Sequence, residues 1–530
     1  MSKLKIVVCD HIHQDGLKII ENRTDVQLIN ASDVDKDTLK KEYIPQADVI
    51  ITRSSTDIDK DFLQHATRLK SIIRAGVGVD NVDIESCSKN GIVVMNIPTA
   101  NTIAAVELTM THILSCVRKF PYAHNNLKVN RIWRRQDWYG TELKDKKLGI
   151  IGFGNIGSRV GKRAQSFEME IIVYDPYIKS STVTDLGMTY SKNFNDILAC
   201  DIITIHTPKT EETIGIISYN EITKMKDGVI LINCARGGLY NEEALFDGLK
   251  SKKIAMAGID VFNKEPSIHH PLLDLDNVIV TPHLGANTKE SQKNIAIQSI
   301  ENALLAIKGI SYPNALNLPF KENELPKELK LYFDLMQKMG YISAQVTKSS
   351  IKSIKISAEG SISNYLDSLY TFAAVGALQE FLGEHVNYIN VDFIAKDRGI
   401  KFYKEKLLSH SGLENKIVLK LTTEHSIFSI SGTVLDNSLQ RIIEIDNYML
   451  ELEPSGKMIL FRNTDTLGVI GDVGKIIAEH KINISDFRLG RDSNSRSLAV
   501  VKVDGNISKE LILELSNLEA CLGISYVNIL

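Results

Sequence analysis

The chain has 530 residues, enough for roughly three or four domains that each bury a hydrophobic core. A hydrophobic content of 43% and a charged content of 24% are ordinary for a globular protein, and a formal net charge of −3 gives no general attraction to nucleic acid or to a membrane surface. No apolar run approaches the ~18–20 residues of a membrane-spanning helix, no secretory signal opens the chain, and the scattered cysteines form no Cys-x-x-Cys motif, so we expect a cytoplasmic protein without disulfides or zinc.

Residues 1–97 alternate short β-rich runs with helical stretches. The clearest strand-like runs are 47–52, 69–74 and 91–96. Strands that alternate with helices indicate a parallel sheet, so this segment predicts a first doubly wound, Rossmann-like domain. We expect the chain to complete this domain when it returns over 286–318.

A glycine-rich motif follows the strand-like run 147–151. Gly152, Gly154 and Gly157 form the pattern Gly-x-Gly-x-x-Gly. The first glycine permits a tight turn, the second lets the backbone approach a pyrophosphate, and the third lets the next helix pack close to the strand. The start of that helix offers unpaired N–H groups and a positive partial charge to the phosphates. The motif predicts a dinucleotide site.

An acidic residue closes the next strand-like run. Asp175 lies 18 residues after Gly157 and is placed to accept hydrogen bonds from a ribose 2′-hydroxyl. Its charge disfavours a 2′-phosphate, and no arginine stands in 176–179. We therefore predict NAD rather than NADP as the cofactor.

The strand rhythm continues beyond the glycine motif. A regular series of β-rich runs predicts a second doubly wound parallel sheet over 98–285. These runs are 147–151, 171–174, 202–206, 229–233, 254–259 and 278–281.

The pattern changes beyond residue 320. Polar and apolar residues alternate in four segments, as in half-buried strands, and predict a separate α+β domain over 320–452. The four segments are 350–357, 386–394, 415–422 and 426–433. After a short linker, residues 455–530 show the order β-α-β-β-α-β, which is typical of a ferredoxin-like domain.

Three residues with suitable chemistry stand just past strands of the second sheet, where loops gather around a ligand. Arg236 offers a planar fork for a carboxylate, and His283 beside Glu265 can exchange a proton near neutral pH. Each residue alone also fits an ordinary surface role. Their common placement in one nucleotide-binding domain favours catalysis.

Two histidine pairs raise the possibility of a metal. His11 lies near His13, and His269 adjoins His270, but no third ligand stands at a suitable spacing. We interpret both pairs as surface loops and predict no metal site.

The motifs at 152–157, 234–238, 260–266 and 282–286 closely resemble those of the D-2-hydroxyacid dehydrogenase superfamily. Within it, the sequence is most similar to the D-3-phosphoglycerate dehydrogenase family, whose long form has a middle domain and a C-terminal ACT regulatory domain. The resemblance is strong over 1–312 and fair over 457–530. In the middle domain it rests mainly on position and size.

The resemblance implies a role for each residue of the second domain. His283 is the general acid/base, Glu265 orients it and favours its protonated form, and Arg236 grips the substrate carboxylate and carbonyl. Many relatives have arginine where this chain has Asn155, so one phosphate contact is in question. The implied NAD-binding residues are Gly152, Gly154, Asn155, Ile156, Gly157, Asp175, Thr207, Cys234, Ala235, Arg236, Asp260, His283, Gly285 and Ala286.

The resemblance also makes 1–97 a substrate-binding domain. The backbone at Gly76 and Val77 is expected to meet the substrate carboxylate, and Arg53 and Arg74 its phosphate. Arg134 and Arg135 either reach the phosphate of a neighbouring subunit or form a solvated basic face. A homodimer or homotetramer is expected.

In the last domain, the loop between the first strand and the first helix resembles an ACT effector loop. Asn463 and Asp465 would bind an amino acid, and Asn483 would contact the same ligand from a facing subunit. Leu467 stands where the family usually has proline, so we expect a less rigid loop and weaker binding of L-serine. The alternative is a domain that only dimerises.

The implied activity is the NAD-dependent oxidation of 3-phosphoglycerate to 3-phosphohydroxypyruvate, the first step of phosphorylated L-serine synthesis. Two alternatives stay open. A reductase for 2-oxoglutarate, hydroxypyruvate or glyoxylate would use the same catalytic residues. A NAD-sensing transcriptional corepressor shares the fold, but no basic DNA-binding segment is visible.

Overall fold

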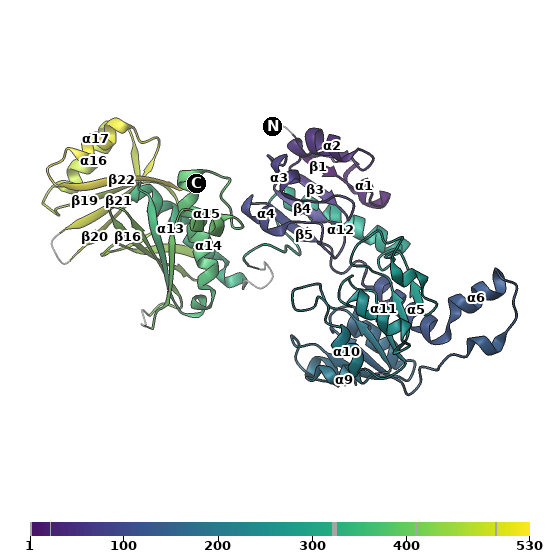
Figure 1. The fold of residues 1–530 in the computed structure, drawn as a ribbon. Coiled ribbons are helices and arrows are strands. Elements are labelled where there is room, and N and C mark those ends of the chain that lie inside the picture. The colour runs from purple at the N-terminus through teal and green to yellow at the C-terminus, as the bar shows by residue number, and fades with distance from the viewer. Residues whose placement is uncertain (1–2, 22, 321–325, 409–411, 493–495, 530) are drawn as a thin grey trace.

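The computed structural model describes residues 3–21, 23–320, 326–408, 412–492 and 496–529. Four β-sheets follow one another along the chain, the first two parallel and the last two mainly antiparallel. In Figure 1 the first two sheets, in purple to teal, lie on one side of the molecule, and the last two, in green to yellow, on the other. The predicted fold class, two Rossmann-like sheets followed by two further α+β units, is confirmed.

The first sheet has five parallel strands in the order β2-β1-β3-β4-β5, a doubly wound arrangement. The chain returns to it after the second sheet, because helix α12 (Lys289–Ile307) packs against β3, β4 and α1. Ile295 and Ile300 of this helix belong to the core of the first sheet. The strands are β1 (Leu4–Val8), β2 (Val26–Asn30), β3 (Val49–Thr52), β4 (Ser71–Arg74) and β5 (Val93–Asn96).

The second sheet has seven parallel strands in the order β12-β11-β10-β9-β6-β7-β8. The order reverses at β6, so a crevice opens beside the loop that follows this strand, the usual place for a dinucleotide. All six predicted strands are present, and the short β8 was not predicted. The strands are β6 (Lys147–Ile151), β7 (Glu170–Tyr174), β8 (Thr189–Tyr190), β9 (Ile202–Ile205), β10 (Val229–Asn233), β11 (Ile254–Ile259) and β12 (Val278–Val280).

The third sheet has six strands in the order β14-β13-β15-β16-β17-β18. The strand expected over 386–394 is wrong. Asn387 begins a turn by accepting hydrogen bonds from the backbone of Ile389 and Asn390, and helix α15 (Val391–Asp397) follows. The strands are β13 (Ile351–Glu359), β14 (Lys401–Lys406), β15 (Lys416–Thr423), β16 (Ile427–Leu435), β17 (Leu439–Ile445) and β18 (Tyr448–Leu452).

The fourth sheet has the order β20-β21-β19-β22, with α16 and α17 between its strands. The predicted β-α-β-β-α-β sequence of elements is confirmed. Its elements are β19 (Gly456–Asn463), α16 (Val469–Glu479), β20 (Asn483–Arg491), β21 (Ser497–Asp504), α17 (Lys509–Ser516) and β22 (Cys521–Ile529).

The third and fourth sheets share a hydrophobic core. Side chains of a strand alternate between its faces, so Ile459 and Phe461 pack under α16 and α17, whereas Met458 and Leu460 join the core of the third sheet. The side chain of Gln345 also bonds to the backbone of Asn528 in β22. These two sheets form one packed body.

The loop at 387–390 contacts the first sheet from this body. The amide of Asn387 donates to the carbonyl of Gly91 at 2.8 Å, and Ile389 is buried in the core of the first sheet. This contact lies before β5, at the edge opposite the carboxyl ends of the strands.

The remaining helices connect and cover the sheets. Among the described residues, no helix combines the length and apolar character needed to cross a membrane. The helices are α1 (Gln14–Glu21), α2 (Lys36–Thr38), α3 (Lys60–Gln64), α4 (Ile84–Lys89), α5 (Thr102–Arg118), α6 (Phe120–Lys128), α7 (Gly157–Gln165), α8 (Ser181–Thr184), α9 (Phe194–Leu198), α10 (Tyr219–Lys224), α11 (Glu242–Lys250), α13 (Lys330–Thr347) and α14 (Leu366–Leu382).

Candidate active site

The carboxyl ends of the first two sheets face each other, and Arg236 bridges them. Arg236 follows β10, and its Nε lies 3.4 Å from Oδ2 of Asp80, which follows β4. A Cβ added to Gly78 would stand 2.3 Å from an Arg236 nitrogen, so the guanidinium lies directly over this loop. The two domains therefore meet around a cation.

The glycine loop has the geometry of a pyrophosphate cradle. Gly152 has φ +87°, and a Cβ there would meet the carbonyl of His206 at 2.8 Å. A Cβ on Gly157 would stand 2.1 Å from the Gly152 carbonyl, whereas one on Gly154 would meet nothing within 4 Å. The loop thus needs two glycines for packing, and the third leaves open space for the cofactor. Asn155, which is exposed, and Ile156, which is half-buried, follow Gly154 in the chain.

Asp175 and Thr207 flank the loop. Asp175 accepts hydrogen bonds from the backbone of Phe153 at 2.9 Å and of Tyr177 at 3.0 Å, so it braces the glycine loop. The Thr207 hydroxyl is buried and has no hydrogen-bond partner among the described residues. Burial also lowers the pKa of His206 to about 3, which keeps that ring neutral. An orphaned buried hydroxyl beside the open cradle fits a bound NAD.

The turn that carries Arg236 is shaped by Asn233, which sequence reasoning did not single out. The Asn233 side chain accepts from the backbone of Ala235 at 3.0 Å and donates to the Arg236 carbonyl at 2.9 Å. Cys234 is buried beneath the turn. An asparagine at a strand end is a common turn former, so the signal was present in the sequence.

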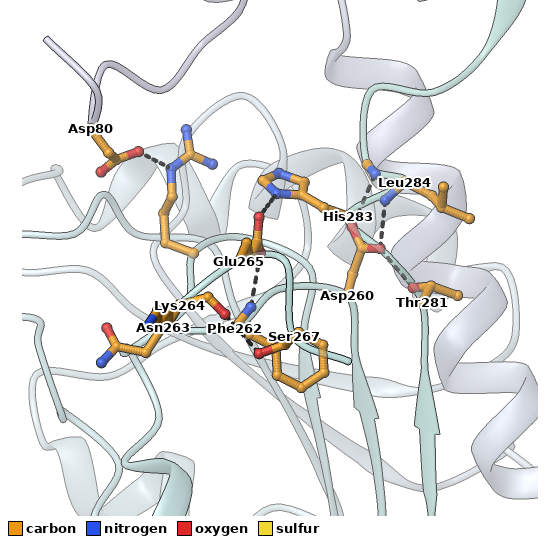
Figure 2. Close-up of polar contacts among 12 residues, drawn as sticks. Asp80, Asp260, Phe262, Asn263, Lys264, Glu265, Ser267, Thr281, His283 and Leu284 are labelled. Atoms are coloured by element: carbon orange, nitrogen blue, oxygen red, sulfur yellow. Dashed lines mark hydrogen bonds and ion pairs between the residues drawn. The ribbon is translucent and has the colours of Figure 1, made fainter. Parts of the chain in front are cut away.

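His283 and Glu265 form a hydrogen-bonded pair. Nδ1 of His283 lies 2.7 Å from Oε2 of Glu265, and the two side chains point toward each other in Figure 2. The other carboxylate oxygen accepts from the backbone of Phe262 at 3.0 Å. Burial raises the pKa of Glu265, but the hydrogen bonds from His283 and Phe262 outweigh it, so the pKa lies below its ordinary value. The carboxylate is ionised and holds a proton on Nδ1, which leaves Nε2 for a substrate.

Asp260 holds the loop that carries His283. It is fully buried and accepts hydrogen bonds from the Thr281 hydroxyl at 2.6 Å and from the backbone of Leu284 and Gly285 (Figure 2). Burial raises its pKa, and the Thr281 hydrogen bond offsets part of that effect. His283 itself has φ +53°, rare for a residue with a side chain. Asp260 thus stabilises an unusual backbone conformation at the site.

A second histidine supports this network. His112, on α5, places Nε2 2.9 Å from the Thr281 hydroxyl, and burial lowers its pKa to about 4. Because Thr281 donates to Asp260, it accepts from His112, whose neutral ring therefore carries the proton on Nε2. Sequence reasoning missed His112. A lone histidine within an otherwise apolar helix was the signal.

Arg53 and Arg74 lie near Arg236 and form a cationic cluster with it. Burial, together with the nearby charges of Arg236 and Arg53, lowers the pKa of Arg74 to about 10. Its Nε is buried without a partner, and a Cβ on Gly76 would strike its guanidinium. Arg53 donates to the carbonyl of His11 at 3.2 Å. Three guanidinium groups close together favour an anionic ligand.

Polar side chains behind the cluster fix its loops. Asp10, which is buried, accepts from the backbone of Arg53 at 2.5 Å, and Asn96 donates to the carbonyl of Val77 at 2.8 Å. Neither residue was predicted, because their partners are far away in the sequence.

Arg134 and Arg135 stand apart from this cluster. They lie on an exposed arm that includes α6 and projects from the second domain in Figure 1. Trp133 beside them is 77% exposed. Within one chain, the arm makes no described contact with the three arginines.

The predicted effector residues are separated in the fourth sheet. Asn463 is buried and accepts from the Ser497 hydroxyl and from the backbone of Asp465. Asp465 pairs with Arg491 at 2.8 Å, at one end of β20. Asn483, at the other end, bonds to Asp504; at ~3.3 Å per residue the two ends are roughly 26 Å apart.

The site therefore combines a dinucleotide crevice, a histidine–glutamate pair and a cluster of cations. This set can bind an anionic hydroxy acid and accept its hydroxyl proton. In the described ranges, no group of three or more His, Cys, Asp or Glu side chains is arranged to hold a metal ion.

Two family models match the chain. The NAD binding domain of D-isomer specific 2-hydroxyacid dehydrogenases matches residues 110–285. The D-3-phosphoglycerate dehydrogenase intervening domain matches residues 328–446.

Known proteins are similar over nearly the whole length. The D-3-phosphoglycerate dehydrogenase of Bacillus subtilis is 35% identical over 528 residues, which cover 99% of each chain. That of Methanocaldococcus jannaschii is 36% identical over 529 residues, 99% of this chain and all of the relative. Among solved structures, D-lactate dehydrogenase from Aquifex aeolicus in complex with NAD and lactic acid is 28% identical, with a TM-score of 0.53 over 60% of this chain and all of that one.

Proposed function

The chain belongs to the D-3-phosphoglycerate dehydrogenase family, and from this premise we propose how its own residues oxidise 3-phosphoglycerate with NAD. The observation that carries the proposal is the His283–Glu265 pair, which stands beside Arg236 and the cationic loops of the first sheet. Gly154 and Thr207 would hold NAD in the crevice beside the glycine loop, and the cofactor would supply the acceptor for the C2 hydride.

His283 removes the proton. Glu265 holds the Nδ1 proton, so Nε2 is the free acceptor for the C2 hydroxyl. The imidazolium that forms is stabilised by the adjacent carboxylate. In the reverse direction the same nitrogen returns the proton to the carbonyl oxygen.

Arginines orient the substrate. Arg236 binds the carboxylate and polarises the C2 oxygen, assisted by the backbone at Gly76 and Val77. Arg53 and Arg74 bind the phosphate by charge-assisted hydrogen bonds. Burial is the main cause of the lowered pKa of Arg74, and repulsion from Arg236 and Arg53 adds to it; this repulsion is relieved when a dianion binds.

A substrate panel tests this function. NADH formation is followed with 3-phosphoglycerate, and NADH consumption is followed in the reductive direction with 3-phosphohydroxypyruvate, hydroxypyruvate, glyoxylate and 2-oxoglutarate. We expect kcat/KM to be higher for the phosphorylated acids by orders of magnitude. A preference for 2-oxoglutarate or glyoxylate would mean that Arg53 and Arg74 do not serve a substrate phosphate. Absence of turnover with every acid would contradict an enzymatic function.

The exposed arm supports a homodimer, or a homotetramer built from it. The large apolar side chains of the arm face solvent in a single chain. A second copy of the chain would bury them. In such a dimer, Arg134 and Arg135 extend toward the partner's phosphate site. Sedimentation of a Trp133→Ser variant, compared with the wild type, tests this arrangement. The residues concerned are Phe120, Leu127, Val129, Ile132, Trp133 and Tyr139.

L-serine is the proposed feedback effector of the fourth sheet. Asp465 and Asn483 lie too far apart in one chain to bind one amino acid, so the proposed site needs a second subunit. Initial rates with added L-serine, and with D-serine as control, test the idea. Unchanged rates up to millimolar L-serine would leave this domain a role in dimerisation alone.

A further inference from the structure

A second histidine–carboxylate pair adjoins the loop that carries Glu265. Glu242 begins α11, and His270 precedes the short turn 271–274. One Glu242 oxygen accepts from the backbone of Asn263 at 2.6 Å, and the other lies 3.1 Å from Nε2 of His270. The Glu242 and His270 side chains are only 23% and 18% exposed. A single carboxylate thus ties both ends of the loop 263–270 to α11.

The hydrogen bonds define the state of His270. The backbone of Leu272 donates to Nδ1 at 3.2 Å, so this nitrogen is an acceptor and the ring proton lies on Nε2. Nε2 then donates to Glu242. The ring of Phe262 packs against that of His270, with centroids 5.1 Å apart. His270 is therefore fixed on three sides.

This pair is connected to the catalytic pair through one peptide. Glu242 holds the backbone of Asn263, and the preceding residue, Phe262, donates its backbone N–H to Glu265. Lys209 adds a contact to the Asn263 side chain at 3.0 Å. The position of the Glu265 carboxylate, and hence of the His283 ring, depends on this anchored stretch of backbone.

We propose that Glu242 and His270 are positioning residues that act on the reaction through Glu265. The inference rests on the proposed roles of Glu265 and His283. Without the two bonds, loop 263–270 keeps its fold but loses the fixed orientation of the carboxylate. Misplacement of a catalytic group by about 1 Å costs up to roughly a hundredfold in rate.

Neighbouring residues provide matched controls. Glu242→Ala and His270→Ala are expected to lower kcat by roughly ten- to a hundredfold. The KM values for 3-phosphoglycerate and for NAD should stay within about threefold of the wild-type values. Glu243→Ala and His269→Ala alter exposed side chains one position away and should leave kcat unchanged. Glu242→Gln keeps one acceptor oxygen, so its kcat should lie between that of the wild type and that of Glu242→Ala. It also serves if the alanine variant fails to fold.

A double-mutant cycle separates positioning from general destabilisation. In a Glu265→Gln background, Glu242→Ala should change kcat by less than about twofold, because the carboxylate that it positions is gone. An equal loss in both backgrounds would overturn the inference. If Glu242→Ala keeps the wild-type kcat while Glu265→Gln is impaired, the positioning role of Glu242 is overturned and the proposed role of Glu265 stands. Wild-type kcat in Glu265→Gln would overturn the proposed role of Glu265 as well.

Discussion

Arg236 and Asp80 form an ion pair between the two parallel sheets, with Nε and Oδ2 3.4 Å apart. The substrate carboxylate competes with Asp80 for this guanidinium. Exposed ion pairs contribute about 0–1 kcal/mol, so Asp80→Asn should lower KM for 3-phosphoglycerate by up to about fivefold and leave kcat within twofold. Initial-rate kinetics measure both. A higher KM would mean that Asp80 orients the arginine instead.

Arg53 and Arg74 should discriminate the phosphorylated substrate. A lost charge-assisted hydrogen bond costs about 1.5–3 kcal/mol, so Arg53→Ala or Arg74→Ala should raise KM for 3-phosphohydroxypyruvate by roughly 10- to 150-fold. KM for hydroxypyruvate should change by less than about threefold, because this acid has no phosphate and loses no such hydrogen bond. Arg68→Ala is the control. Arg68 lies before β4, at the end of the strands opposite to the arginine cluster, and pairs with Asp48 there. Equal effects on both acids would place the phosphate elsewhere.

The glycine loop allows stability and cofactor binding to be separated. An added methyl at Gly154 meets nothing within 4 Å, so Gly154→Ala should keep the melting temperature but weaken NAD binding. Gly157→Ala places its methyl 2.1 Å from a backbone carbonyl and should impair both. Calorimetric titration with NAD and thermal denaturation report the two quantities. Full NAD affinity in Gly154→Ala would contradict the cradle.

Glu265 should make stability depend on pH. Its pKa is lowered in the folded chain, so its stabilising contribution is present above the unfolded value of about 4.3 and is lost as the pH falls through the folded pKa. The free energy of unfolding of the wild type, minus that of Glu265→Gln, should therefore shrink below about pH 4. Urea denaturation at several pH values measures this difference. A difference that grows on acidification would contradict the assignment.

Local patterns in the sequence predicted most of the fold. The glycine motif and the apolar runs identified the second sheet, because a buried parallel strand reads as a continuous apolar segment. The two-residue strand β8 is too short to leave a pattern. Over 386–394 the alternation was real, but Asn387 and Asn390 set a turn that overrode it.

Arg236, Glu265 and His283 were proposed as catalytic because each follows a strand, whereas the residues that support them were missed. His112 and Thr281 are 169 positions apart, and Glu242 and Asn263 are 21 apart. Such contacts exist only after the chain has folded, and no spacing rule connects them. The roles of the substrate and effector residues stay predictions.

The core shared by the third and fourth sheets limits how this enzyme can be shortened. Met458, Leu460 and Val500 cover apolar surface of the preceding unit. A polypeptide truncated after residue 452 would present that surface to water and should aggregate. An engineered version without the third and fourth sheets would need its new terminus before Phe320, whose ring already packs against Phe372 and Tyr388 of that body.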